Sequence, residues 1–324
     1  MTALAPGRSG AVMRAVVSVP GGIGNLGPGL DVLGCAVAGR RDEVTAEWSD
    51  APGVTLLEAG HPDLPSDPAR HTSAIAAAAV FDVARRRGAQ LSAPGISLRV
   101  RKELPLSGGQ GGSAASAVAG AVAADALLGS TLDQTMLLQC CLLAEETVAG
   151  RHLDNIAPSL LGGIVLVRSV DPIDVVRLPV PDGLRVVLAH PAQRLRTSDA
   201  RGVLPASVPR AVAVHQIAQV AAIVAACHAN DLALLGRSID DHIAEPARAP
   251  LLPGFLDAKE AAMTAGALGA SISGAGPTAF ALTAGEEVAE RVAAAMQAAY
   301  ERAGLECSVR VTHVDPHGAV VKTA

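Results

Sequence analysis

The sequence predicts an α+β fold, and three observations lead to this fold class. Segments that alternate like β-strands and segments with helical composition are mixed in both halves of the chain. The 324 residues suffice for two domains with ample cores, and neither an internal repeat nor a low-complexity linker interrupts them. Half of the residues are hydrophobic but only 2% are aromatic, so small and branched aliphatic side chains must fill the core.

Charge and cysteine content argue against several classes of function. The net charge of −5 and the scarcity of aromatic side chains speak against a nucleic-acid partner. No run of about 18 apolar residues is uninterrupted, so no membrane partner is expected. Five cysteines without CxxC spacing indicate reduced core residues of a cytoplasmic protein, and no histidine cluster of zinc-like spacing is present.

The N-terminal elements are predicted to be strands on either side of a glycine-rich stretch. Residues 1–12 lack the apolar core of a signal peptide and are interpreted as a disordered tail. A strand is expected over residues 12–19, ending at Pro20, and further strand is expected over residues 42–58.

The glycine-rich residues 21–34 formally match GxGxxG, but Pro28 argues against the helix that a dinucleotide-binding unit needs at this point. Two polar residues of the stretch, Asn25 and Asp31, therefore need another explanation. They are either turn-forming side chains or part of the wall of a site for a small polar substrate.

A second glycine-rich stretch, residues 104–116, joins a predicted strand at 96–101 to an alanine-rich helix expected to begin near Ser113. Glycines let backbone N–H groups turn inward, and a helix N-terminus adds unpaired donors, so this pattern is typical of a phosphate cradle. A flexible turn capped by Ser113 is the alternative. No lysine follows a glycine here, so the stretch is not a Walker A motif.

Two carboxylates follow near the end of a predicted helix. Thr131 is expected to open a capping box of a helix that reaches residue 148 and carries Glu145 and Glu146 in its last turn. Carboxylates at this end of a helix are unfavourable by about 0.3–1 kcal/mol. They are therefore either solvated surface acids or, as the alternative, a ligand of a magnesium ion.

Polar side chains gather again in residues 150–163, just before a predicted strand at 164–167. Such a cluster beside a buried strand requires hydrogen-bond partners. His152 alone is better explained as structural, whereas Asp154 and Asn155 are candidates for contacts with substrate or phosphate.

The second half of the chain is predicted to continue with helices and strands. Residues 194–201 gather three arginines, of which Arg201 is suited to bind a carboxylate or phosphate with its fork. The glycine-rich residues 266–278 are interpreted as a tight connection between a helix and a strand. The expected helices are 72–87, 209–229, 232–243 and 286–304, and the expected strands are 184–190, 279–283 and 308–314.

Taken together, four of these segments resemble the GHMP kinase superfamily and, within it, the homoserine kinases. They are residues 19–34, 105–116, 152–163 and 271–278, and residues 197–205 and 245–254 are similar to homoserine kinases in particular. The resemblance covers nearly the whole chain. It implies a two-domain GHMP kinase fold, with a ribosomal protein S5 domain 2-like N-terminal domain over residues 13–167 and a ferredoxin-like C-terminal domain over residues 168–324.

The resemblance also implies an activity, the transfer of the γ-phosphate of ATP to the side-chain hydroxyl of L-homoserine for threonine synthesis. ATP and Mg²⁺ are the implied cofactors, and a homodimer is common among relatives. The residues implied to wrap the ATP phosphates are Pro105, Leu106, Ser107, Gly108, Gly109, Gln110, Gly111, Gly112, Ser113, Ala114 and Ala115. Ser113 and Glu145 are the implied magnesium ligands.

The same resemblance implies the substrate contacts. The residues that match positions around the amino-acid substrate are Asn25, Asp31, His152 and Asn155, with Arg201 and Arg248 as the pair that would bind its carboxylate. Asp31, Asp154 and Asn155 are the catalytic candidates. Either aspartate is suited to accept the hydroxyl proton, although the resemblance implies that no dedicated base is needed.

One departure from the family pattern falls in the phosphate loop. The usual Gly-Leu-Gly-Ser-Ser is here Gly109-Gln-Gly-Gly-Ser113, so one serine hydroxyl is missing and Gln110 replaces an apolar residue. Activity is expected to survive because the backbone supplies most phosphate contacts. A kinase for another small hydroxy acid, of the mevalonate or shikimate type, and a catalytically silent nucleotide- or metabolite-binding protein are the alternative functions.

Overall fold

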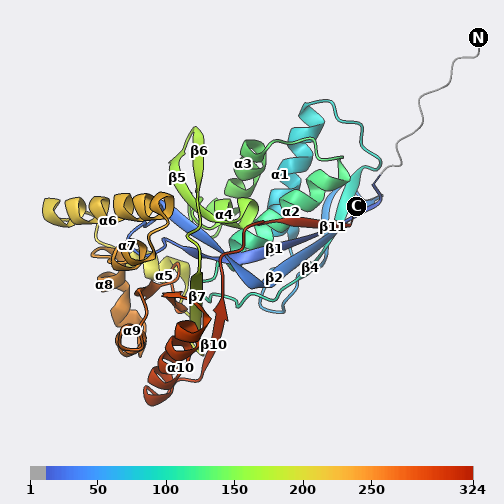
Figure 1. Ribbon diagram of the computed structural model, residues 1–324. Helices are drawn as coiled ribbons and strands as arrows, with labels where there is room; N and C mark the ends of the chain where they lie inside the picture. Colours follow the sequence, from blue (N-terminus) through green and yellow to red (C-terminus); the bar gives the residue numbers. More distant parts are fainter. Residues whose placement is uncertain (1–11, 324) are drawn as a thin grey trace, which may run out of the picture.

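The structure, a computed structural model that describes residues 12–323, contains two β-sheets covered by helices (Figure 1). Within these residues the first sheet has seven strands: β1 (Arg14–Gly24), β2 (Leu33–Ser49), β3 (Gly53–Glu58), β4 (Gly95–Arg101), β5 (Ile164–Val170), β6 (Ile173–Leu178) and β11 (Val320–Thr323). Their order is β11-β1-β2-β4-β3, and β5 and β6 extend the sheet from β2. The pairs are antiparallel except for β3 and β4, which run parallel.

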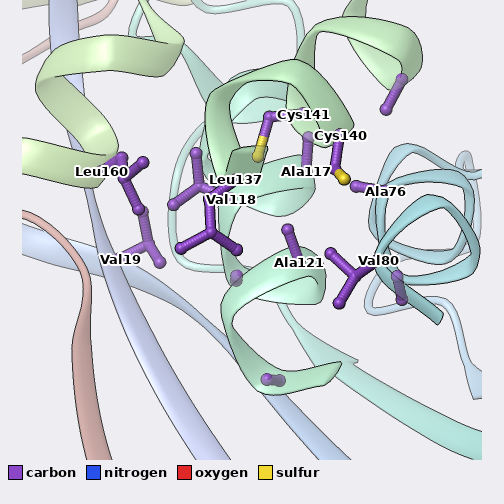
Figure 2. Close-up of a cluster of buried hydrophobic side chains, with 14 of the residues drawn as sticks. Val19, Ala76, Val80, Ala117, Val118, Ala121, Leu137, Cys140, Cys141 and Leu160 are labelled. Carbon is purple, nitrogen blue, oxygen red and sulfur yellow. The ribbon is translucent and has the colours of Figure 1, made fainter. Parts of the chain in front are cut away.

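The helices of the N-terminal domain lie on one face of this sheet (Figure 1). They are α1 (Thr72–Arg86), α2 (Gly112–Leu127), α3 (Gln134–Glu146) and α4 (Ile156–Leu161), with a 3₁₀ turn, η1 (Pro68–Arg70), before α1. Figure 2 shows side chains of α2 such as Val118 packed between those of α1, including Val80, and those of α3, including Leu137. Small residues allow this close packing, since a Cβ on Gly120 would lie 2.1 Å from the carbonyl oxygen of Ser73 in α1.

The second sheet lies in the C-terminal half. Within residues 184–312 its strands are β7 (Leu184–Pro191), β8 (Gly269–Ile272), β9 (Ala279–Ala284) and β10 (Cys307–Thr312), in the antiparallel order β10-β7-β9-β8. The helices here are α5 (Thr197–Gly202), α6 (Arg210–Ala229), α7 (Leu232–Arg237), α8 (Ala244–Arg248), α9 (Phe255–Thr264) and α10 (Glu286–Arg302), with the 3₁₀ turn η2 (Ala249–Leu251) after α8. This strand order, with helical crossovers after β7 and β9, is the ferredoxin-like arrangement that was predicted.

Apolar packing holds the two domains together. On one face of the second sheet, α9 and α10 bury Phe255, Met296 and Tyr300. The opposite face packs against α6 and α7 and also against the ends of β1 and β2, through residues such as Ile23 and Leu33. The shared core fixes the domains relative to each other, and so positions the polar residues that lie between them.

The chain does not pass from the first sheet to the second at the predicted domain boundary between residues 167 and 168. That boundary falls inside β5, and the following strand, β6, still belongs to the first sheet. The chain also returns to this sheet at its C-terminal end, where β11 pairs with β1. Of the predicted disordered tail, residues 1–11 lie outside the described residues, whereas the carbonyl of Val12 accepts a hydrogen bond from the indole N–H of Trp48 at 2.9 Å.

The first strand is longer than predicted. It passes through Pro20 and continues to Gly24, with a register shift at Pro20. Glycines suit the strand here, because a Cβ on Gly21 would lie 2.6 Å from the Leu104 side chain and one on Gly22 would lie 2.8 Å from the Cys35 carbonyl oxygen. The irregular turn is therefore confined to the residues that follow Gly24.

Three other predictions about helices and strands are wrong. The N-cap of α3 is Asp133, which accepts a hydrogen bond from the N–H of Met136 at 2.9 Å, so the predicted capping box at Thr131 does not form. The helix predicted over residues 232–243 ends at Arg237, because the next residues form a turn in which Asp241 caps α8. The glycine-rich residues 266–278 contain a strand, β8, as well as a turn.

The cysteines and one apolar helix bear on the predicted class of protein. All five cysteines lie within the described residues and are buried and free, as expected for reduced core residues. By length and composition alone α6 could cross a membrane, but its Ile223, Ala226 and Cys227 pack into the core beside the second sheet. The absence of a membrane partner stays a prediction.

Candidate active site

A cavity of about 760 Å³ lies between the two domains beside the N-terminus of α2. The predicted site residues that line it are Asn25, Pro105, Leu106, Ser107, Gly108, Gly109, Gly111, Gly112, Ser113, Glu145, His152, Asp154, Asn155, Arg201 and Arg248. Four predicted residues, Asp31, Gln110, Ala114 and Ala115, do not line it. Ala114 and Ala115 are fully buried inside the first turn of α2, so their side chains contact the core.

The loop before α2 has the conformation that a phosphate cradle needs. Gly109 and Gly111 have positive φ angles of 72° and 67°, which L-residues other than glycine adopt at a cost. Gly111 is the N-cap of α2 and has no side chain to cap it, so no side chain of the described residues caps the first N–H groups of the helix. The loop therefore presents backbone donors and the positive end of the helix dipole to the cavity.

Residues of the C-terminal domain hold this loop in place. The hydroxyl of Ser273 donates to the carbonyl of Gly109 at 2.7 Å, and the hydroxyl of Thr278 donates to the carbonyl of Gly108 at 2.5 Å. A Cβ on Gly109 would lie 2.5 Å from the carbonyl oxygen of Ser273. The predicted tight connection at residues 266–278 thus also acts as a support for the loop.

A buried ion pair also holds the loop before α2 in place. Lys102, at the end of β4, pairs with Asp42 of β2, and their side chains are 5% and 0% exposed. The Lys102 ammonium also donates to the carbonyl of Gly112 at 2.8 Å, while Asp42 accepts the N–H groups of Glu103 and Leu104 at 3.0 and 3.1 Å. The lysine stands outside any Walker motif, yet it fixes both ends of the loop.

Gln110 points away from the cavity. Its side chain is buried, and its amide N–H donates to the Thr278 hydroxyl at 3.1 Å while its amide oxygen accepts from Arg310 at 3.5 Å. The Thr278 hydroxyl donates its one proton to Gly108, so the Nδ1 of His190, 2.9 Å away, must donate to it as well. The polar residue that departs from the family pattern therefore ties the loop to the second sheet.

Replacing Gln110 with leucine should lower the free energy of unfolding by about 1 kcal/mol, because two buried hydrogen bonds are lost while Thr278 keeps its other partners. KM for a nucleotide should hardly change, since the side chain does not face the cavity. Denaturant unfolding and steady-state kinetics of Gln110→Leu measure both quantities. A rise in KM of about tenfold with unchanged stability would contradict this role.

Glu145 and Ser113 meet at the other side of the cavity. The Ser113 hydroxyl donates to Oε1 of Glu145 at 3.1 Å, and burial raises the pKa of this carboxyl to about 7. Its Oε2 is shielded from solvent and has no hydrogen-bond partner among the described residues. Glu145 is thus no solvated surface acid, whereas its neighbour Glu146 is exposed. A buried carboxylate oxygen without a partner fits a cation ligand.

Asp31 and Arg201 contact each other, a pairing that the sequence did not predict. The Nη2 of Arg201 lies 2.7 Å from Oδ1 of Asp31, and the Nδ1 of His152 lies 3.2 Å from the same oxygen. The Nε of Arg201 is buried and has no partner among the described residues. Asp31 has a positive φ of 60° and reaches the cavity only through these two partners, which line it.

Asp154 and Asn155 line the cavity between the loop and the Asp31–Arg201 ion pair. Oδ2 of Asp154 accepts the N–H of Asn25 at 3.1 Å and the side-chain amide of Asn155 at 3.2 Å. Burial, and then the charge of Asp31, raise the pKa of Asp154 to about 6. Asn25, in a left-handed conformation with a φ of 68°, binds the carbonyl of Gly274 at 3.0 Å through its amide.

Arg248 is a buried cation whose partners are backbone carbonyl groups. Its side chain donates to the carbonyls of Ala200 and Gly274 at 3.1 and 2.9 Å, and the residue is 2% exposed. Within residues 12–323 no carboxylate lies at ion-pair distance from it. Burial and the nearby Arg201 lower its pKa. A buried guanidinium that lines a cavity without a counter-charge suits an anionic ligand.

Comparison with known proteins agrees with this geometry. Residues 73–163 match the family model of the GHMP kinases N terminal domain, and residues 223–302 match that of the GHMP kinases C terminal domain. The homoserine kinase of Chlorobium phaeobacteroides is 40% identical over 308 residues, which cover 92% of this chain and 96% of the relative. This chain belongs to the homoserine kinase family. It is accordingly a kinase, a phosphotransferase of the GHMP type.

Two further members of the homoserine kinase family support this assignment. The homoserine kinase of Arabidopsis thaliana is 38% identical over 309 residues, covering 93% of this chain and 82% of the relative. The crystal structure of homoserine kinase from Cytophaga hutchinsonii superposes with a TM-score of 0.90 at 39% identity, covering 98% of this chain and all of that chain. The predicted two-domain GHMP kinase fold is confirmed.

Several cavity residues of this homoserine kinase family member were missed by sequence reasoning. They are Asp63, Leu64, Pro65, Arg70, His71, Thr72 and Lys102 of the N-terminal domain, and Arg194, Arg196, Thr197 and Ser198 of the C-terminal domain. The arginine-rich residues 194–201 gave a signal for the second group. Residues 63–72 gave no such signal, because only the folding of the chain brings them to the cavity. There the Thr72 hydroxyl donates to the Ser113 carbonyl at 3.3 Å.

Proposed function

We propose that this protein transfers the γ-phosphate of ATP to the side-chain hydroxyl of L-homoserine, giving O-phospho-L-homoserine for threonine synthesis. The observation that carries the proposal is the composition of one cavity. It joins a glycine loop at a helix N-terminus, suited to phosphates, to the buried guanidinium of Arg248, suited to a carboxylate because no acidic group among the described residues pairs with it. The 40% identity to a homoserine kinase over 92% of the chain supports the choice of substrate.

In this proposal the loop binds the ATP phosphates through residues 105–115. Gln110, Ala114 and Ala115 contribute backbone groups, because their side chains face the interior. Phosphoryl transfer passes through a loose transition state, so alignment of donor and acceptor and neutralisation of charge supply most of the rate. A rigid loop anchored by both domains provides that alignment.

Ser113 and Glu145 fit the magnesium ion that ATP-dependent kinases use. The Glu145 Oε2 is buried without a partner among the described residues, and the Ser113 hydroxyl, bonded to Oε1, lies beside it. Both offer the oxygen ligands that this ion prefers. When bound, the ion neutralises charge on the transferred phosphoryl oxygens. Its charge would also keep the Glu145 carboxylate ionised, although burial alone raises the pKa to about 7.

The acceptor would bind on the other side of the cavity. Arg248, with Arg201, would bind the substrate carboxylate, while Asp31 would attract the amino group and Asn25, His152 and Asn155 would complete the pocket. The Asp31–Arg201 contact at 2.7 Å means that the amino acid must share or replace this pair when it binds. An amino acid carries both complementary charges, so it can satisfy both partners at once.

The hydroxyl proton has two candidate acceptors, Asp31 and Asp154. Asp31 is already engaged by Arg201 and His152, at 2.7 and 3.2 Å, and does not itself line the cavity. The pKa of Asp154 is raised to about 6, so at neutral pH it is ionised and more basic than an exposed aspartate. Asn155, whose amide binds Asp154, would orient this carboxylate toward the acceptor.

Replacing Arg248 with lysine should raise KM for L-homoserine by roughly 10–100-fold, because an ammonium cannot supply the guanidinium fork and its carbonyl contacts together. The value of kcat should fall less, since Arg248 acts on the bound carboxylate and not on the reacting oxygen. Steady-state kinetics over a range of homoserine concentrations give both values. The matched control is Arg237→Lys at an exposed arginine, which should leave them unchanged.

The product identifies the acceptor group. ³¹P NMR of a reaction with ATP, Mg²⁺ and L-homoserine should show a stable phosphate monoester whose phosphorus couples to the side-chain methylene protons. An acid-labile acyl phosphate would instead place the transfer on the carboxylate and overturn the proposed reaction.

A further inference from the structure

A cluster of two histidines and an aspartate lies in the C-terminal domain, away from the cavity. His215 belongs to α6, and Asp240 and His242 belong to the turn between α7 and α8. One ligand atom from each of the three lies within 4.8 Å of the others. The Nε2 of His215 is 3.0 Å from Oδ2 of Asp240, and the Nε2 of His242 is 3.3 Å from Oδ1.

The neighbouring residues hold these three side chains in place. Gln216, buried beside His215, donates to Oδ1 of Asp241 at 2.8 Å and accepts the N–H of His242 at 3.2 Å. Asp241 is also buried and caps the first turn of α8 through three backbone N–H groups. Each ligand is therefore adjacent in sequence to a buried, hydrogen-bonded residue, so the backbone that carries the three side chains is held in place.

One buried nitrogen of the cluster, the Nε2 of His215, has no hydrogen-bond partner among the described residues. The Nε2 of His215 is shielded from solvent and makes no hydrogen bond among the described residues, although Oδ2 of Asp240 lies 3.0 Å away. The rings of His215 and His242 stack at 3.9 Å with an angle of 11° between them. The Nε2 atoms of both rings face the Asp240 carboxylate.

We propose that His215, Asp240 and His242 bind a divalent transition-metal ion of the Zn²⁺ type. Two imidazole nitrogens and a carboxylate oxygen are a common three-ligand set for zinc, with water in the fourth position. Ligands about 2.0–2.1 Å from a tetrahedral ion lie roughly 3.3 Å apart. Here the Nε2 of His242 lies 3.3 Å from Oδ1 of Asp240, and the Nε2 of His215 lies 3.0 Å from Oδ2 of the same carboxylate. The His242 side chain is 49% exposed, so its ring has room to turn out of the stack toward the ion.

This site is chemically distinct from the one proposed for Mg²⁺. Glu145 and Ser113 offer only oxygen, whereas the imidazoles favour a softer ion. A bound ion would join α6 to the turn before α8. Gln216 also donates to the carbonyl of Pro28 at 2.7 Å, and α8 ends at Arg248, so the ion would restrain both segments that lead to the cavity.

Zinc binding to the metal-stripped full-length protein, without ATP, tests the proposal. Titration calorimetry with Zn²⁺ alone should give one ion per chain for the unchanged protein, and this binding should be lost in His215→Ala and in His242→Ala. His228→Ala, at an exposed histidine of the same helix, and Glu145→Ala should keep it. Co²⁺ in place of Zn²⁺ should give the visible absorption of a tetrahedral site in the same variants.

Thermal unfolding provides a readout that does not depend on heat of binding. Saturating Zn²⁺ should raise the midpoint by roughly 2–4 °C in the unchanged protein and leave it unchanged in His242→Ala, where the side chain removed is 49% exposed. Zinc binding that persists in the His215→Ala His242→Ala double variant, or that disappears only in Glu145→Ala, would overturn the proposal. So would the absence of binding to the unchanged protein.

Discussion

Glu145→Gln should lower kcat by roughly 10²–10³-fold, the range seen when one strong electrostatic contact to a transition state is removed. Glutamine keeps an oxygen for the Ser113 hydroxyl at the position of Oε1, so the geometry should survive. It removes the negative charge and replaces Oε2, the oxygen without a partner among the described residues, both of which fit the magnesium ion. The free energy of unfolding should not fall, because burial already disfavours the charged form of this side chain.

The neighbouring residue supplies the control. Glu146→Gln changes the same side chain one position along α3, where it is exposed, and should leave kcat unchanged. Measuring kcat at saturating ATP, Mg²⁺ and homoserine, together with thermal unfolding, separates chemistry from folding. A Glu145→Gln protein with kcat within about threefold of the original would contradict the role given to this carboxylate.

Asp42→Ala should lower the free energy of unfolding by about 3–5 kcal/mol, since it leaves the Lys102 ammonium buried without a counter-charge. The N–H groups of Glu103 and Leu104 lose their acceptor in the same change. Because these residues begin the loop before α2, KM for ATP should rise as well. Denaturant unfolding gives the stability, and the double variant Asp42→Ala Lys102→Met should recover much of it.

An ion pair one residue away is the matched control. Glu43 pairs with Lys322, and their side chains are 25% and 51% exposed. Glu43→Ala should therefore cost no more than about 1 kcal/mol. If Asp42→Ala costs no more than Glu43→Ala, the buried pair does not support the loop.

The fold was largely accessible from sequence because its signals are local. Alternation of apolar residues predicts strands that overlap most of those observed, although β6, β8 and β11 were not predicted. The glycine-rich stretch before an alanine-rich helix predicts the loop at the N-terminus of α2. The boundaries that failed depend on tertiary contacts. β1 runs past Pro20 because its glycines fit against Leu104 and Cys35, and no local pattern contains that information.

The sequence predicted many residues of the site but not the contacts that they make with one another. Sequence motifs named Arg248 and Glu145, and the structure brings both to one cavity. They could not show that Asp31 pairs with Arg201, because 170 residues separate the two. Nor could they show that Gln110 turns toward Thr278, since the direction of a loop side chain is set by the domain packed against it.

Acceptor selectivity is the measurement that tests the proposed function most directly. ADP release should be followed by a coupled assay with ATP and Mg²⁺ and with L-homoserine, L-serine, mevalonate or shikimate as acceptor. The proposal predicts turnover with L-homoserine far above that with the other three, and its loss in Glu145→Gln. Preferred turnover of mevalonate or shikimate would contradict the substrate, and ATP binding without turnover of any acceptor would contradict the proposed kinase reaction.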